Sequence, residues 1–206
     1  MCSGGGGPWA RLQGQFARAG WPVRIHLTDK HPNPEAIQKW SQESRQGIEY
    51  LAEPVDATRV PPHLKGMRTL FEGFHHFRPE QARSILRDAV ENRAAIGVFE
   101  ASLKPPAGLL VLLLSPLMTL VSYLLLTPFI KPRTLSRFFW TYLAPVVPLV
   151  TCWDGIVSLL RVYSPQELGK LTAPLEGEDY TWEIGQASMG APIFVYTYLV
   201  GYPTSR

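Results

Sequence analysis

This chain of 206 residues contains few cysteines and has a small net charge. Cys2 and Cys152 are its only cysteines, too few for a disulfide framework or a cysteine-bound zinc site, and they fit a reducing compartment. The chain has 20 Lys and Arg against 17 Asp and Glu. An excess this small does not indicate nucleic acid as a partner. The first residues lack the apolar stretch of a secretory signal, so we expect the globular part to be cytoplasmic.

Acidic residues are absent between Glu100 and Asp154. This window contains two apolar runs, 107–130 and 138–153. The first run has about 24 residues, and about 20 are enough to cross the hydrocarbon core of a bilayer. The basic residues between the runs are Lys131, Arg133 and Arg137. The pattern predicts a membrane-associated helical insertion over 104–153, with the lipid bilayer as its partner.

Two arrangements of this insertion are open. In a spanning hairpin the basic residues between the runs would lie on the far side of the membrane, against the tendency of Lys and Arg to stay in the cytoplasm. If each run enters and returns on one side, these residues stay at the headgroups. Pro116 and Pro128 in the first run, and Pro145 and Pro148 in the second, provide helix breaks. We favour the re-entrant arrangement over the spanning one.

Outside this window, short apolar segments alternate with amphipathic helical patterns, which is typical of a parallel α/β sheet. Strands are expected at 23–29, 48–57, 67–74 and 94–101, and helices at 34–46 and 79–92. Asn33 is the expected cap of the first of these helices. A capping box of Ser164 and Glu167 begins a later helix. The alternating segments 180–186 and 193–201 predict an antiparallel hairpin.

A glycine-rich segment, Ser3-Gly4-Gly5-Gly6, lies close to the start of the chain. Glycines let the backbone approach a ligand closely, and their N–H groups can bind an anion. About 20 to 25 residues further on, Asp29 ends an expected strand, where a carboxylate can accept the hydroxyl protons of a ribose. The alternatives are a disordered tail for the glycines and a turn residue for Asp29.

Polar residues also follow the next two expected strands. Asp56-Ala57 follows the strand 48–57, where an Asx turn is an equal alternative. Phe74-His75-His76-Phe77 follows the strand 67–74. The two adjacent histidines lack a second pair of ligands, so we expect no metal site. A buried structural histidine and the wall of an active site are both compatible with this motif.

The order and spacing of these motifs resemble the class I S-adenosylmethionine-dependent methyltransferases. The resemblance implies an α/β, Rossmann-like sheet with a C-terminal antiparallel hairpin, and S-adenosylmethionine as the cofactor. The residues that it places at the cofactor are Ser3, Gly4, Gly5, Gly6, Asp29, Asp56, Ala57 and Phe74. The candidates for catalytic groups are His75, His76 and Glu100.

One departure from the family concerns the sheet. Its first strand should precede the glycine loop and lie in the middle of the sheet, yet only Met1 and Cys2 precede Ser3. We therefore expect a truncated chain or a start upstream of Met1. We also expect a split sheet or a rearranged pairing, with Ser3–Gly7 poorly fixed.

The domain organisation that follows has three parts. Residues 1–103 form the cofactor-binding part, 104–153 the apolar insertion, and 154–206 a helix and hairpin that complete the domain. The predicted function is methyl transfer from S-adenosylmethionine to a lipophilic small molecule at the membrane. One alternative is a non-enzymatic membrane protein that keeps a degenerate methyltransferase-like fold. A dinucleotide-dependent dehydrogenase is the other, although the glycines lack a clear G-x-G-x-x-G pattern.

Overall fold

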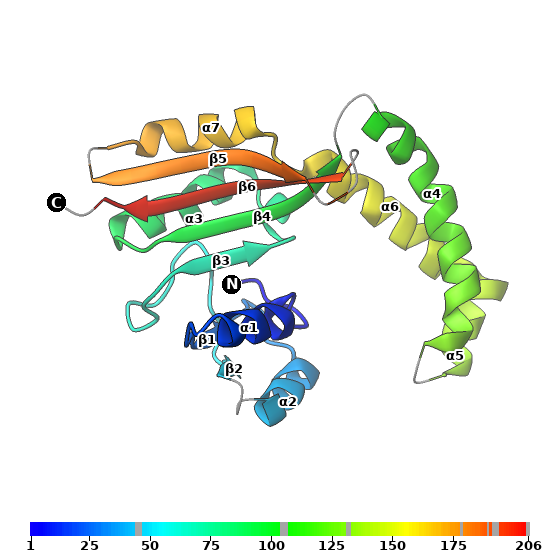
Figure 1. Ribbon diagram of the computed structural model, residues 1–206. Helices are drawn as coiled ribbons and strands as arrows, with labels where there is room; N and C mark the ends of the chain where they lie inside the picture. The colour runs from blue at the N-terminus through cyan, green and yellow to red at the C-terminus, as the bar shows by residue number, and fades with distance from the viewer. Residues whose placement is uncertain are drawn as a thin grey trace. The chain divides into compact units, whose positions relative to one another are not determined.

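The computed structural model describes residues 1–43, 47–103, 107–130, 133–177, 179–188, 190 and 194–204. The chain forms two compact units, and Figure 1 shows the helices and strands of each. The first unit comprises Met1–Glu100, Tyr163–Gln186 and Thr197–Arg206. The second comprises Ala101–Val162 and Ala187–Tyr196. Lys104 and Lys131, two of the basic residues near the insertion, lie outside the described residues.

The smaller sheet of the first unit contains two parallel strands, β1 (Ile25–Leu27) and β2 (Ile48–Tyr50). The helices α1 (Trp9–Arg18) and α2 (Pro34–Glu43) accompany them. The alternate residues Ile25, Leu27, Ile48 and Tyr50 of these strands bury together with Trp40 of α2. Both strands are shorter than expected. Asn33 caps α2 as predicted, accepting the N–H groups of the first helical turn.

The larger sheet has four strands in the order β3 (Arg68–Phe71), β4 (Ile96–Leu103), β6 (Phe194–Pro203), β5 (Tyr180–Ser188). β3 and β4 are parallel, whereas Figure 1 shows β6 running opposite to β4 and β5. The last strand thus lies between β4 and β5. In the residues that the structure describes, the chain is a mixed α/β protein with two sheets.

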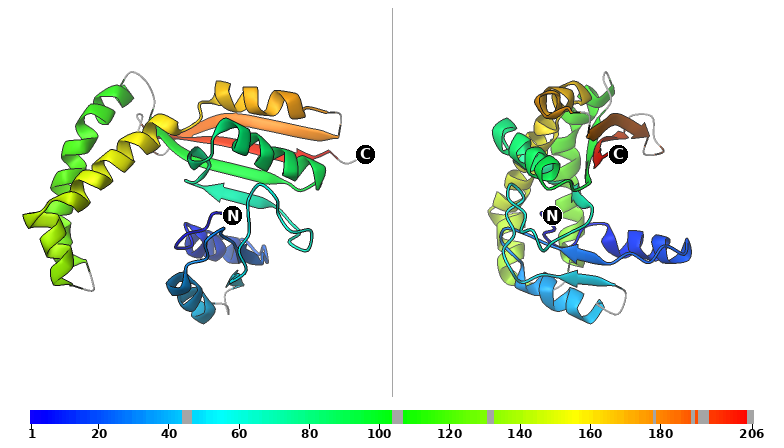
Figure 2. Two further views of the ribbon diagram at one scale, coloured as in Figure 1. Left: turned by 180° about the vertical axis from the view of Figure 1, so that it is seen from behind. Right: turned by 90° about the vertical axis from the view of Figure 1, so that its left-hand side faces the viewer.

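Two helices cover one face of the larger sheet, α3 (Pro79–Glu91) and α7 (Pro165–Thr172), as Figure 2 shows. The fully buried core between helices and sheet includes Leu70, Ile85 and Leu199. α7 begins with the predicted capping box, in which Ser164 accepts the N–H of Glu167 and donates its own N–H to that carboxylate. Short 3-10 helices follow β3 and α7, at Phe74–His76 and Ala173–Leu175.

The expected split of the sheet is present, because β1 and β3 belong to different sheets. The first three residues lie between them. The amino group of Met1 donates to the carbonyl of Thr69 in β3 at 2.7 Å. The N–H of Ser3 donates to the carbonyl of Thr28, directly after β1, at 3.1 Å. The views in Figures 1 and 2 both place the N-terminus between the two sheets.

The second unit is mainly helical. Its elements are α4 (Ala107–Leu126), a 3-10 turn (Thr127–Phe129), α5 (Leu135–Phe138), a π-helical turn (Phe139–Leu143) and α6 (Val146–Arg161). α4 and α6 contact each other, and the thiol of Cys152 donates to the carbonyl of Pro116. The expected helix break at Pro116 is wrong, because α4 continues through this residue.

Pro145 does mark a break, because it caps α6 after the π-helical turn. The segments Leu135–Leu143 and Val146–Arg161 meet at an angle of 72°. Within the described part of the chain, none of the helices is by itself long and apolar enough to cross a bilayer. The bent pair reaches that length and apolarity only when its two segments are taken together.

Candidate functional site

The residues predicted at the cofactor gather where the strands of the first unit end. Asp29 follows β1, Asp56 follows β2, and His75 lies in the 3-10 helix after β3. The carboxyl ends of parallel strands meet at one edge of a sheet, which is where α/β proteins bind ligands. The N-terminal residues join the two sheets, because Met1 bonds to Thr69 of β3 and Ser3 bonds to Thr28, directly after β1.

The glycine loop is bound to β1 and to the carboxylate that follows it. The hydroxyl of Ser3 accepts the N–H of Thr28 at 3.2 Å. The N–H of Gly4 donates to Oδ2 of Asp29 at 2.9 Å. These bonds join residues 25 positions apart in the sequence. The loop and the predicted ribose-binding carboxylate are therefore direct neighbours.

Two aromatic side chains fix the rest of the loop. Tyr50 of β2 donates its hydroxyl to the carbonyl of Gly4 at 3.1 Å, and the indole N–H of Trp40 donates to the carbonyl of Gly5 at 3.0 Å. Gly6 has a φ of +109°, and a Cβ there would lie 2.4 Å from the Trp40 ring. The expectation that this loop is poorly fixed is wrong, because side chains from α2 and β2 bind its carbonyls.

Asp29 is half-buried, and its carboxylate is held from two sides. Oδ2 accepts the N–H of Gly4, and Oδ1 accepts the N–H of His31 at 3.0 Å. An ionised carboxylate has about four acceptor positions. The carboxylate thus has a fixed orientation and capacity for further donors, such as a pair of hydroxyl groups.

The carboxylate of Asp56 accepts more hydrogen bonds than that of Asp29. It accepts Nζ of Lys30 at 2.7 Å, and both the N–H and the hydroxyl of Thr58 at 2.9 and 2.7 Å. The hydrogen bonds from Lys30 and Thr58 lower the pKa of the Asp56 carboxyl from 3.8 to about 2. Asp56 is therefore ionised at neutral pH.

A cavity of about 770 Å³ lies beside Asp56, between this edge and α3. Its volume is within the range of about 300 to 1,000 Å³ that is usual for small-molecule sites. Ala57 lines it, as do Cys2 and Lys30. Burial raises the pKa of the Cys2 thiol. This thiol is therefore protonated at neutral pH and is not an activated nucleophile.

His75 and Glu100 form a buried pair at the same edge. Glu100, on β4, accepts Nδ1 of His75 at 2.5 Å and the N–H groups of Gly73 and Phe74 at 2.8 and 2.7 Å. It thereby satisfies the first donors of the 3-10 helix and orients the imidazole. His76 is exposed, and its ring centroid lies 4.2 Å from that of His75. Of the three predicted catalytic candidates, His76 is the most accessible.

Phe74 lies away from the cavity. Its side chain is fully buried in the core, and its ring is 5.5 Å from that of Tyr163.

Sequence reasoning missed Lys30, Trp40 and Tyr50, which bind Asp56 or the loop. Lys30 could have been predicted, because it directly follows Asp29 in the sequence. The roles of Trp40 and Tyr50 depend on contacts between residues far apart in the sequence. No group of three or more His, Cys, Asp or Glu suited to a metal ion occurs in the portion of the chain that the structure describes.

No protein-family model matches this chain, and no curated protein matches it. Several solved structures are similar in fold, and two of them are described here. One is LepI in complex with SAM, with a TM-score of 0.54 and 16% identity. The other is a pericyclic reaction enzyme, with a TM-score of 0.55 and 15% identity. Each alignment covers 99% of this chain but only 42% of the similar structure, so the chain spans about two fifths of their length.

Proposed function

We propose that the first unit binds S-adenosylmethionine at the carboxyl edge of its strands. The observation that carries the proposal is the hydrogen bond between the N–H of Gly4 and the carboxylate of Asp29. It joins the two motifs that the family resemblance assigns to the cofactor. The similarity in fold to LepI, which was solved in complex with SAM, supports the same ligand.

The residues at this edge fit the groups of that cofactor. Asp29 has acceptor capacity for the two ribose hydroxyls, whose bonds to a carboxylate are charge-assisted. Asp56 and Ala57 border the cavity of about 770 Å³, which has room for the adenine. Ser3 and Gly4 lie beside Asp29, and nothing lies within 4 Å of a Cβ added at Gly4 or Gly5, which leaves space for the amino-acid part of the cofactor. Gly6 instead packs closely against Trp40.

We propose methyl transfer as the reaction. The bound cofactor supplies a methyl group on a positively charged sulfur, and such transfer depends mainly on positioning and on the exclusion of water. The chain contributes the orientation of His75 by Glu100 and an accessible imidazole, His76, to take a proton from the acceptor. Glu100 is a positioning residue in this proposal, since it accepts three donors and is 3% exposed.

We further propose that the second unit binds the cytoplasmic face of a lipid bilayer and that the acceptor is lipophilic. Large apolar side chains of α4 and α6 are exposed, among them Leu113, Leu117, Met118, Leu149, Val150 and Trp153. Arg133 and Arg137 belong to the connection between these helices and suit anionic headgroups. The 72° bend before α6 fits a segment that enters the membrane and returns.

A second candidate is a non-enzymatic membrane protein with a degenerate form of this fold. The split between β1 and β3 favours it, because the site then lacks one continuous sheet beneath it.

Calorimetry on the full chain in detergent tests the main proposal. We expect saturable binding of S-adenosylmethionine and none of NAD. Binding of NAD alone would reject the assignment, and binding without methyl transfer to any lipid extract would favour the non-enzymatic candidate.

A further inference from the structure

The main segment of the second unit, Ala101–Val162, begins directly after Glu100 and ends directly before Tyr163. At its start, β4 continues past Glu100 without a break. At its end, only Val162 and Tyr163 separate the last residue of α6 from Ser164, the cap of α7. A continuous strand and a two-residue link leave little slack in either connection.

The two residues that flank this segment bind the same turn of the first unit, Gly73–Phe77. Glu100 accepts donors from the first three residues of the turn. Tyr163 donates its hydroxyl to the carbonyl of Phe77 at 2.7 Å, 86 positions away in the sequence. The ring of Tyr163 also lies 5.5 Å from that of Phe74. Glu100 thus holds one end of the turn and Tyr163 the other.

This turn carries the two imidazoles of the proposed reaction and borders the proposed cofactor cavity. The ring centroids of His75 and His76 are 4.2 Å apart, and Phe77 lines the cavity of about 770 Å³. Transfer requires the reacting atoms to lie about 3 to 3.5 Å apart, so a small displacement of the turn changes the rate. The proposed contacts of the cofactor with Asp29 and Asp56 do not depend on this displacement.

The phenol of Tyr163 remains a hydrogen-bond donor at neutral pH. Burial and the negative charge of Glu167 raise the pKa of this phenol above its ordinary value of 10. The hydroxyl therefore stays protonated and keeps its bond to the carbonyl of Phe77. This end of the turn is held wherever the link after α6 places Tyr163.

We propose that Tyr163 is a positioning residue for this turn, through which binding of a lipid bilayer by the second unit changes the position of His76. The inference rests on the proposed membrane binding and methyl transfer. A ligand shifts an equilibrium between two arrangements only by binding them with different affinity. The bilayer binds one position of α6 better, and the two-residue link passes that position to Tyr163 and the turn.

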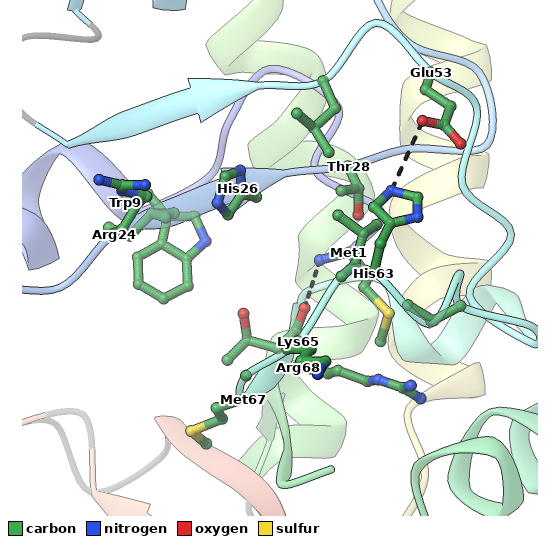
Figure 3. Close-up of a pocket in the computed structure, with 16 residues that line it drawn as sticks. Met1, Trp9, Arg24, His26, Thr28, Glu53, His63, Lys65, Met67 and Arg68 are labelled. Atoms are coloured by element: carbon green, nitrogen blue, oxygen red, sulfur yellow. Dashed lines mark hydrogen bonds and ion pairs between the residues drawn. The ribbon is translucent and has the colours of Figure 1, made fainter. Parts of the chain in front are cut away.

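Two features of the first unit provide matched controls. Tyr180 donates its hydroxyl to the carbonyl of Ala94 at 2.8 Å, also 86 positions away, and this bond lies at the amino end of β4, away from the turn. His63 is exposed and lines a different cavity, of about 540 Å³, together with residues of β1 and β3 (Figure 3). Tyr180→Phe therefore controls for a lost tyrosine bond, and His63 is an internal reference for His76.

Acylation by diethyl pyrocarbonate, followed by mass spectrometry, tests the proposal on the full chain. The rate at His76 is divided by the rate at His63, in detergent and in vesicles of phosphatidylcholine and phosphatidylglycerol. We expect this ratio to differ at least twofold between the two media in the wild type and in Tyr180→Phe. In Tyr163→Phe, which keeps the ring but loses the hydroxyl, the two media should give the same ratio.

A longer link tests the route of the effect. Insertion of Gly-Gly between Val162 and Tyr163 keeps the bond to Phe77 but adds slack, so the difference between the two media should disappear. An inserted chain that keeps the full difference overturns the proposal. Equal ratios in the two media for the wild type overturn it as well, and so does a difference that is as large in Tyr163→Phe as in Tyr180→Phe.

Separate measurements distinguish this inference from the proposed function. Flotation reports lipid binding, and calorimetry reports cofactor binding, which should agree within twofold between the wild type and Tyr163→Phe. A chain that floats and binds S-adenosylmethionine without a change at His76 rejects only the inference. A chain that does not float rejects the membrane anchor and the inference together. A change at His76 that depends on lipid and on Tyr163, without cofactor binding, supports the coupling and rejects the proposed reaction.

Discussion

The backbone N–H of Gly4 lies 2.9 Å from Oδ2 of Asp29, and it joins the glycine loop to the carboxylate that ends the first strand. The bond fixes both groups at the edge where ligands of α/β proteins bind. The same carboxylate accepts the N–H of His31, so its orientation is set before any ligand arrives.

Substitution of Asp29 tests the proposed cofactor site. Asp29→Ala removes an acceptor for the ribose hydroxyls and should weaken binding of S-adenosylmethionine by about 1.5 to 3 kcal/mol, the usual value for bonds to a charged group. Asp154→Asn removes an exposed carboxylate of the second unit and serves as the control. Calorimetry measures both, and equal affinities for the two variants would contradict the role of Asp29.

Gly6→Ala should destabilise the first unit. A Cβ at this position would lie 2.4 Å from the Trp40 ring, and its φ of +109° is unfavourable for alanine. We expect a loss of about 1 to 3 kcal/mol in the free energy of unfolding. Gly14→Ala, in α1 with nothing within 4 Å of its added Cβ, should instead be neutral or stabilising. Urea denaturation compares them, and equal effects would show that Gly6 is not confined.

Lys30→Met should raise the pKa of Asp56 from about 2 toward 3.8, because the hydrogen bond from Lys30 is the largest cause of its lowering. A lowered carboxyl pKa contributes stability that is present above the unfolded value and is lost as pH falls from about 4 toward about 2. NMR titration of the carboxyl carbon measures the pKa. Lys39→Met is the control, since Lys39 lies over the Trp40 ring and not beside Asp56. An unchanged pKa of Asp56 in Lys30→Met would refute the pairing of Lys30 with Asp56.

Glu100→Ala should be strongly destabilising, because it leaves His75 and the N–H groups of Gly73 and Phe74 without their acceptor. Each buried donor without a partner costs about 1 to 3 kcal/mol. Glu100→Gln keeps one oxygen for the two backbone donors, so its free energy of unfolding should fall less than that of Glu100→Ala. Chemical denaturation ranks the variants, and nitrogen NMR of His75 should show a changed Nδ1 signal in Glu100→Gln. An unaltered signal there would argue against positioning by Glu100.

Deletion of 107–153, replaced by a short Gly/Ser bridge, should release the protein from membranes in a flotation assay. A full chain that stays soluble without detergent would reject the anchor.

Labelling of Thr134→Cys, with Cys2 and Cys152 changed to serine, distinguishes the two topologies. Reaction only after lysis supports the re-entrant form, and reaction in intact cells supports a spanning hairpin.

Local patterns in the sequence were sufficient for much of the fold. The caps at Asn33 and Ser164 and the helix Pro79–Glu91 follow from residues within one or two turns of each other. Hydrophobic periodicity and capping act between near neighbours, so they can be read without the tertiary structure.

Tertiary packing decided how the site is assembled. The hydroxyl of Tyr50 reaches the carbonyl of Gly4 across 46 positions of sequence, and Trp40 reaches Gly5 across 35. Glu100 became the acceptor for the helix after β3 because β4 pairs beside β3 in the observed register. No local pattern encodes such contacts, since they depend on how separate elements pack. The sequence by itself determined which groups of the site are polar, and packing determined which of them are held, buried or accessible.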